Sequence, residues 1–135
     1  METIVRYLGN TKFEAVTRGH RVICDQPVDN YGTDAGMSPP EFLLVSLGAC
    51  AGYYATQYLR VRGLNTENLT VRVSAGKAVR PTRMDRFVIE VEAPDVDAKH
   101  YEGLMRSIRA CLIHNTLNHG ANVEINLHTA APAFA

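Results

Sequence analysis

The chain has 135 residues, the ordinary size of one domain, and a domain of this length can bury a core without disulfide staples. Its 14 Lys and Arg residues balance its 14 Asp and Glu residues, so no overall field attracts nucleic acid or an anionic membrane. We therefore expect one domain, residues 1–135, whose partner is a small molecule or a second copy of the chain. The N-terminus lacks the basic segment and apolar run of a secretory signal, which predicts a reducing cytoplasm.

Three short β-prone segments open the chain, at Ile4–Leu8, Lys12–Thr17 and Arg21–Asp25. Gly9-Asn10 and Gly19-His20 separate them, which predicts a three-stranded meander. Residues 26–37 are dense in Pro, Asp, Asn and Gly and predict a loop, and loops of this length are often functional.

Residues 38–63 form the only long segment that reads as wholly buried. No charged residue lies between Glu41 and Arg60, Ser38 and Glu41 are spaced as a capping box, and Gly63 supplies a stop. Small and polar residues dilute the run, so we expect a core helix rather than a membrane span. Gly48 and Gly52 predict close approach of another backbone, either the second helix or the same helix of another subunit.

Beyond this helix, apolar and polar residues alternate over 69–75 and 86–92, as in strands with one buried face. An amphipathic helix is predicted over 101–108 and a short helix over 112–118. Alternation returns at 123–127 and predicts a last strand. The order βββ-α-ββ-α(α)-β is that of an α+β fold with mainly antiparallel pairing.

The cysteines carry the most informative chemistry. Free cysteines are often simply buried hydrophobes, and we interpret Cys24 in that way. Cys50 and Cys111 lie on two predicted helices, where they could come close enough for thiol chemistry. Cys111 and His114 lack the further ligands of a zinc site, and no phosphate-binding motif is present, so we expect neither a metal nor a cofactor.

At GMSPPEFLLVSLGAC and CLIHNTL the sequence resembles the OsmC/Ohr family of osmotically induced and organic-hydroperoxide-resistance proteins. The resemblance spans nearly the whole chain. It implies an OsmC-like fold with antiparallel sheets around a long central helix, an intertwined homodimer, and active sites near the dimer interface. It also implies a thiol peroxidase of the oxidative-stress response that reduces organic hydroperoxides, with Cys50 as the peroxidatic and Cys111 as the resolving cysteine. An external dithiol would then reduce the disulfide.

Two further site residues carry over less directly from the family. Pro40 occupies the place of a family glutamate and Glu41 follows it, while Arg18 is the candidate for an arginine from an early hairpin. A mid-helix cysteine cannot use the amides at the start of its own helix, so we expect a nearby cation to lower the pKa of Cys50. The altered glutamate leaves an alternative open, a non-enzymatic protein that binds an apolar or thiol-bearing small molecule at the dimer interface. A purely structural dimer is a third hypothesis.

Overall fold

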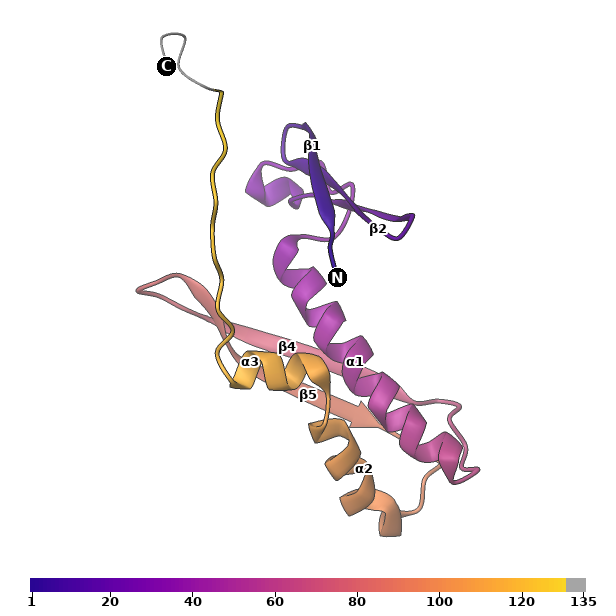
Figure 1. Ribbon diagram of the computed structural model, residues 1–135. Helices are drawn as coiled ribbons and strands as arrows, with labels where there is room; N and C mark the ends of the chain where they lie inside the picture. The colour runs from indigo at the N-terminus through magenta and orange to yellow at the C-terminus, as the bar shows by residue number, and fades with distance from the viewer. Residues whose placement is uncertain (131–135) are drawn as a thin grey trace.

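A computed structural model describes residues 1–130 (Figure 1). Its first unit is an antiparallel sheet of β1 (Ile4–Gly9), β2 (Lys12–Thr17) and β3 (His20–Cys24), in that spatial order. Arg18 and Gly19 form the second turn with φ of 50° and 81°, and Thr17 pairs with His20 across it. Positive φ at both central residues is the geometry that suits the twist of a two-residue hairpin. The predicted meander is confirmed.

A buried carboxylate holds the loop after this sheet. Asp25 has no exposed surface, and its oxygens accept hydrogen bonds from the Thr11 and Thr33 hydroxyls and from the backbone N–H groups of Gln26, Thr33 and Ala35. The loop contains one short 3₁₀ turn, η1 (Val28–Asn30). The sequence analysis missed Asp25, whose position directly after a strand and before a polar loop was the available signal.

We expect Asp25→Asn to destabilise the protein at neutral pH. Hydrogen bonds, first from Thr11 and then from the Ala35 amide, the Thr33 hydroxyl and the Gln26 amide, outweigh burial and hold the pKa of Asp25 far below its usual range. A carboxyl with a lowered folded-state pKa stabilises the fold above its unfolded value of about 3.9, and this stabilisation is lost as the pH falls towards the folded-state pKa. The difference in urea midpoint between wild type and Asp25→Asn should therefore shrink below pH ~4. A difference that stays constant with pH would contradict this prediction.

The central helix α1 (Pro39–Val61) confirms the predicted long helix, but the expectation that it is wholly buried was wrong for the single chain, in which Val45 and Tyr53 are 49% and 58% exposed. Leu47, Ala51, Ala55 and Leu59, spaced four residues apart, are fully or almost fully buried and form the stripe on which the remaining elements pack. The chain leaves the helix through Gly63, which has a φ of 65°. At the start of α1 the Ser38 hydroxyl donates to the Glu41 carboxylate at 2.8 Å, and no side chain caps the backbone amides.

The antiparallel hairpin of β4 (Thr70–Ala78) and β5 (Arg83–Glu92) packs on one side of α1. A Cβ atom added at Gly48 would lie 2.9 Å from Val73 Cγ2, and one at Gly52 would lie 3.4 Å from Val71 Cγ2. The two glycines thus admit a strand of the same chain. The expectation of a second helix at this face was wrong, because the sequence pattern specifies a close approach without specifying the element that approaches.

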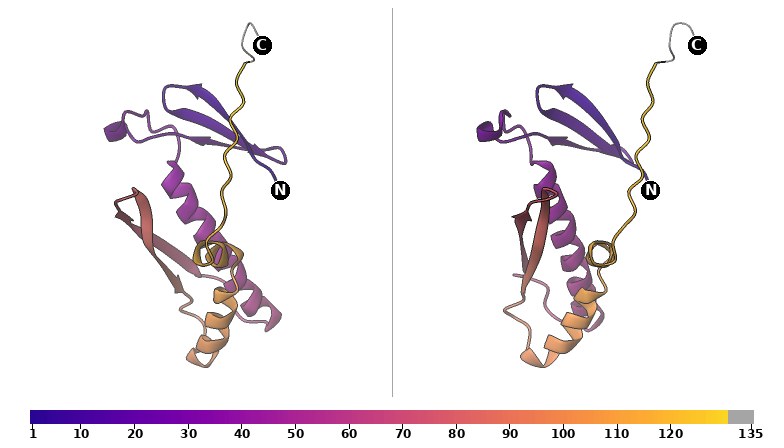
Figure 2. Two further views of the ribbon diagram at one scale, coloured as in Figure 1. Left: turned by 60° about the vertical axis from the view of Figure 1, so that its left-hand side comes forward. Right: turned by 90° about the vertical axis from the view of Figure 1, so that its left-hand side faces the viewer.

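The helices α2 (Tyr101–Arg109) and α3 (Leu112–Asn118) lie against another side of α1, as the two turned views make clear (Figure 2). A short 3₁₀ turn, η2 (Ala98–His100), precedes α2, and the Asp97 carboxylate accepts the Lys99 N–H at 2.9 Å. The Tyr58 hydroxyl meets His100 Nδ1 at 3.1 Å and joins the end of α1 to the start of α2. Both predicted helices are confirmed.

The last predicted strand does not form within this chain. Residues 121–130 are extended, but they pair with no strand among residues 1–130 and run clear of the other elements (Figure 1). Val123, Ile125 and Leu127 are 84%, 87% and 85% exposed. A strand needs a sheet edge to pair with, and this chain places none beside the segment. No helix within residues 1–130 combines the length and apolar character that crossing a bilayer requires.

Candidate active site

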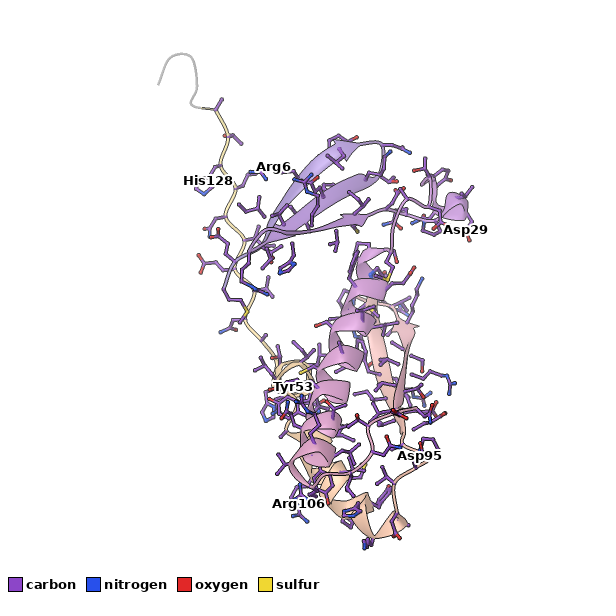
Figure 3. All side chains as sticks on the ribbon, turned by 90° about the vertical axis from the view of Figure 1, so that its right-hand side faces the viewer. Arg6, Asp29, Tyr53, Asp95, Arg106 and His128 are labelled. Carbon is purple, nitrogen blue, oxygen red and sulfur yellow. The ribbon has the colours of Figure 1, made fainter. Side chains whose placement is uncertain are left out.

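Cys50 lies in the middle of α1, on the side that meets α3. Cys50 is half-buried, whereas the neighbouring Leu47 and Ala51 are buried. The cysteine therefore lies at the edge of the core. Tyr53, one turn further along, is exposed (Figure 3).

Cys111 is completely buried and precedes the first residue of α3. Its sulfur accepts the backbone N–H of His114 at 3.5 Å, so the cysteine caps the helix. The pKa values of the Cys111 and Cys50 thiols depend on each other, which places the two side chains close together. Both thiols are free, and the fold has brought together two cysteines that are sixty-one positions apart in sequence.

The two thiols differ in acidity. Burial raises the pKa of Cys50, but hydrogen bonds from the Cys111 thiol and from the Ile113 and Leu112 amides stabilise the thiolate, and the pKa ends below its ordinary value. Burial raises the pKa of Cys111, and its interaction with Cys50 raises it further. Cys50 is therefore the more acidic thiol of the pair.

The source of this activation differs from our expectation. We expected a cation beside Cys50, but within residues 1–130 the groups that stabilise its thiolate are a thiol and two backbone amides. The amides belong to the first turn of α3, where N–H groups have no partner inside the helix. The sequence analysis considered only the amides of the helix that carries Cys50, and so it missed the contribution of the α3 amides to the pKa of Cys50. The predicted start of the short helix at Leu112 was the signal that could have revealed it.

The other two predicted site residues lie elsewhere in this chain. Glu41 is nine residues before Cys50, about 13 Å along the helix at about 1.5 Å per residue. The cysteine whose pKa the Glu41 charge affects is Cys24. Burial raises the pKa of Cys24, and the negative charges of Asp25 and Glu41 raise it further. Arg18 lies in the exposed turn between β2 and β3. The chain thus brings Cys50 and Cys111 together, and catalytic roles for Glu41 and Arg18 stay predictions.

Metal ligation receives no support from the geometry. No three His, Cys, Asp or Glu side chains within residues 1–130 are grouped as a metal site would need. His114, which follows Cys111 by one helical turn, has its Nε2 atom 2.9 Å from Asn118 Nδ2.

A half-buried cysteine in the middle of a long helix, beside a buried second cysteine at the start of a following helix, is thus the candidate site on an α+β scaffold. The family model for OsmC-like proteins matches residues 32–126, and the chain belongs to this family. A search of curated protein sequences finds no match.

Solved structures share the fold. A protein from Psychrobacter arcticus, provisionally assigned to osmotic stress induction and the detoxification response, superposes with a TM-score of 0.76 at 23% identity, covering 84% of this chain and 85% of that one. The OsmC-like protein of Mycoplasma pneumoniae gives 0.72 at 18% identity, covering 87% and 86%. An organic hydroperoxide resistance protein from Legionella pneumophila, also described as a predicted redox protein, gives 0.63 at 15%, covering 87% and 89%.

Proposed function

We propose that this protein reduces organic hydroperoxides by a two-cysteine mechanism. The observation that carries the proposal is the placement of a half-buried Cys50 beside the completely buried Cys111, and the lowered pKa of Cys50 and the raised pKa of Cys111 agree with it. A thiolate is the nucleophilic form of cysteine, so the more acidic and more accessible thiol is the one suited to attack. Family membership and a structural relative described as a redox protein give further support.

The proposed reduction of a hydroperoxide needs neither a metal nor a prosthetic group. The Cys50 thiolate attacks the terminal peroxide oxygen, the O–O bond breaks, and the alkoxide leaves and takes up a proton as an alcohol. Cys50 is then a sulfenic acid. The Cys111 sulfur displaces its hydroxyl, which departs as water with the Cys111 proton, and a disulfide forms. An external dithiol returns the pair to two thiols and is itself oxidised to a disulfide.

One equivalent of cumene hydroperoxide should convert Cys50 and Cys111 to a disulfide and leave the Cys24 thiol free. Cys24 is an internal control because it is also half-buried but has a raised pKa. Peptide mapping after alkylation measures the three cysteines separately. Oxidation of Cys24 to the same extent, or no loss of thiol at Cys50, would contradict the mechanism. The alternative of a non-enzymatic binding protein predicts instead a Cys50 pKa at or above its ordinary value.

We also propose that the working unit is a homodimer. The chain exposes 10,594 Å², well above the roughly 7,000 Å² expected for a folded monomer of 14.9 kDa. The excess is consistent with apolar side chains left open on two parts of the chain. On the first sheet, Ile4, Val5, Tyr7, Leu8, Phe13 and Val22 are exposed, and so are the three apolar residues of the 121–130 segment. Burial of both surfaces by a second copy would stabilise the fold.

A further inference from the structure

Helix α2 turns its small residues to the core. Ser107 Oγ donates to the Tyr54 carbonyl oxygen at 2.9 Å, and a Cβ at Gly103 would overlap the Tyr58 ring and hydroxyl. These contacts fix which face of α2 packs on α1. The large apolar residues of α2, which an amphipathic helix normally buries, form a different face and are only half-buried.

That apolar face borders an open cleft. Leu104, Met105 and Ile108 line one wall, and Ile89 and Val91 of β5 line the other, around a volume of about 520 Å³. The walls are half-buried, and α2 packs chiefly on α1, while β5 packs on β4 and α1. Cavities of this size lined mostly by apolar side chains are typical of small-molecule sites. Neither Cys50 nor Cys111 lines the cleft, so it is separate from the thiol pair.

Polar groups gather where α2 meets α3. Arg109 and His114 line this end of the cleft, and Arg109 forms no ion pair with a carboxylate of residues 1–130. Glu90 also borders the cleft, and it shares Arg72 with Glu92, at 3.7 Å and 3.3 Å respectively. His114 Nδ1 is buried and has no hydrogen-bond partner within the described chain. Within residues 1–130, Arg109 is therefore the cleft residue whose positive charge is free to meet an anion.

We propose that the cleft binds an amphipathic monocarboxylate, with the apolar chain between α2 and β5 and the carboxylate at Arg109. The guanidinium presents two parallel N–H donors that match the two oxygens of a carboxylate. From Tyr101 at the far end to Arg109 the helix rises about 12 Å at about 1.5 Å per residue, which accommodates a medium-length alkyl chain. The side chains that form the two walls of the cleft are less exposed than the apolar residues of the first sheet and of the 121–130 segment. A second copy of the chain is therefore the better partner for the first sheet and the 121–130 segment, and a small molecule for the cleft.

Calorimetry with decanoate and with decanol tests this site in the full chain. Wild type should bind both, and Arg109→Ala should weaken decanoate binding about tenfold, the effect of losing a charged hydrogen-bonding partner, while decanol binding stays unchanged. Arg106→Ala is the matched control, because Arg106 borders a different cleft with Gln57 and Arg62. It should change neither affinity.

Amide chemical shifts locate the bound ligand. Decanoate should perturb residues 89–91 and 104–109 and leave the amides of β1 to β3 unmoved. Absence of binding, equal weakening in the two arginine variants, shifts centred on the first sheet, or dissociation of a dimer by decanoate would each overturn the proposal. Loss of hydroperoxide turnover in Cys50→Ser leaves this binding intact, so failure of the cleft and failure of the peroxidase proposal are distinguishable.

Discussion

Cys50→Ser should lower hydroperoxide turnover with a dithiol reductant by roughly a thousandfold or more, the order of loss that follows removal of an enzyme nucleophile. A serine hydroxyl does not ionise near neutral pH, so the amides of Leu112 and Ile113 would have no anion to stabilise. The measurement is steady-state consumption of cumene hydroperoxide in the presence of dithiothreitol. Retention of more than a small fraction of wild-type turnover would rule out Cys50 as the attacking residue.

Two substitutions at Cys111 test the resolving step separately from the first oxidation. Cys111→Ser keeps a hydroxyl donor beside Cys50 and should still allow one stoichiometric oxidation, whereas Cys111→Ala removes the donor and should also slow that first step. Neither variant can form the disulfide with Cys50. Cys24→Ser is the matched control, since Cys24 lies at the end of β3, and it should turn over at the wild-type rate. Disulfide-linked cycling in either Cys111 variant would contradict its assigned role.

Ile125→Asp should convert the proposed dimer to monomer at concentrations where wild type stays associated. Ile125 is 87% exposed in the single chain, and full burial of such a side chain contributes about 1.5–3 kcal/mol. Two copies are lost per dimer, so the dissociation constant should rise by about 10²- to 10⁴-fold. Light scattering coupled to size exclusion measures the mass directly.

Asn126→Asp is the control for this change. It introduces the same charge one position away, on the opposite face of an extended segment, and should leave the dimer nearly intact. A monomeric wild type would contradict the dimer proposal. Equal dissociation by the two variants would show that charge, rather than a buried apolar face of residues 123–127, controls association.

The elements of this fold follow from local patterns that a single sequence displays. The uncharged run between Glu41 and Arg60 predicts one long helix, and it forms as α1 because a buried helix needs only its own residues to be apolar. Alternation over 69–75 and 86–92 similarly predicts β4 and β5. The pairing of Cys50 with Cys111 came from family resemblance, since the sixty residues between them leave their separation open.

Contacts between distant elements were decided only by the tertiary structure. The spacing of Gly48 and Gly52 allows close approach, but only the packed chain identifies β4 as the neighbour. The apolar stripe of α2 predicts a helix, yet only the packed chain shows that Gly103 and Ser107 meet α1, where a Cβ at Gly103 would overlap the Tyr58 ring.

Local patterns therefore predicted the order of the elements as far as α3 and identified the cysteines as candidates for thiol chemistry. The packing of the chain decided that Cys50 lies beside Cys111 and the first turn of α3, that Asp25 anchors the first loop, and that residues 123–127 pair with no strand among residues 1–130. The physical reason is the separation along the chain of the residues on which each feature depends. Helix and strand periodicity is written in neighbouring residues, whereas hydrogen bonds to a thiolate or a sheet edge depend on where the rest of the chain is placed.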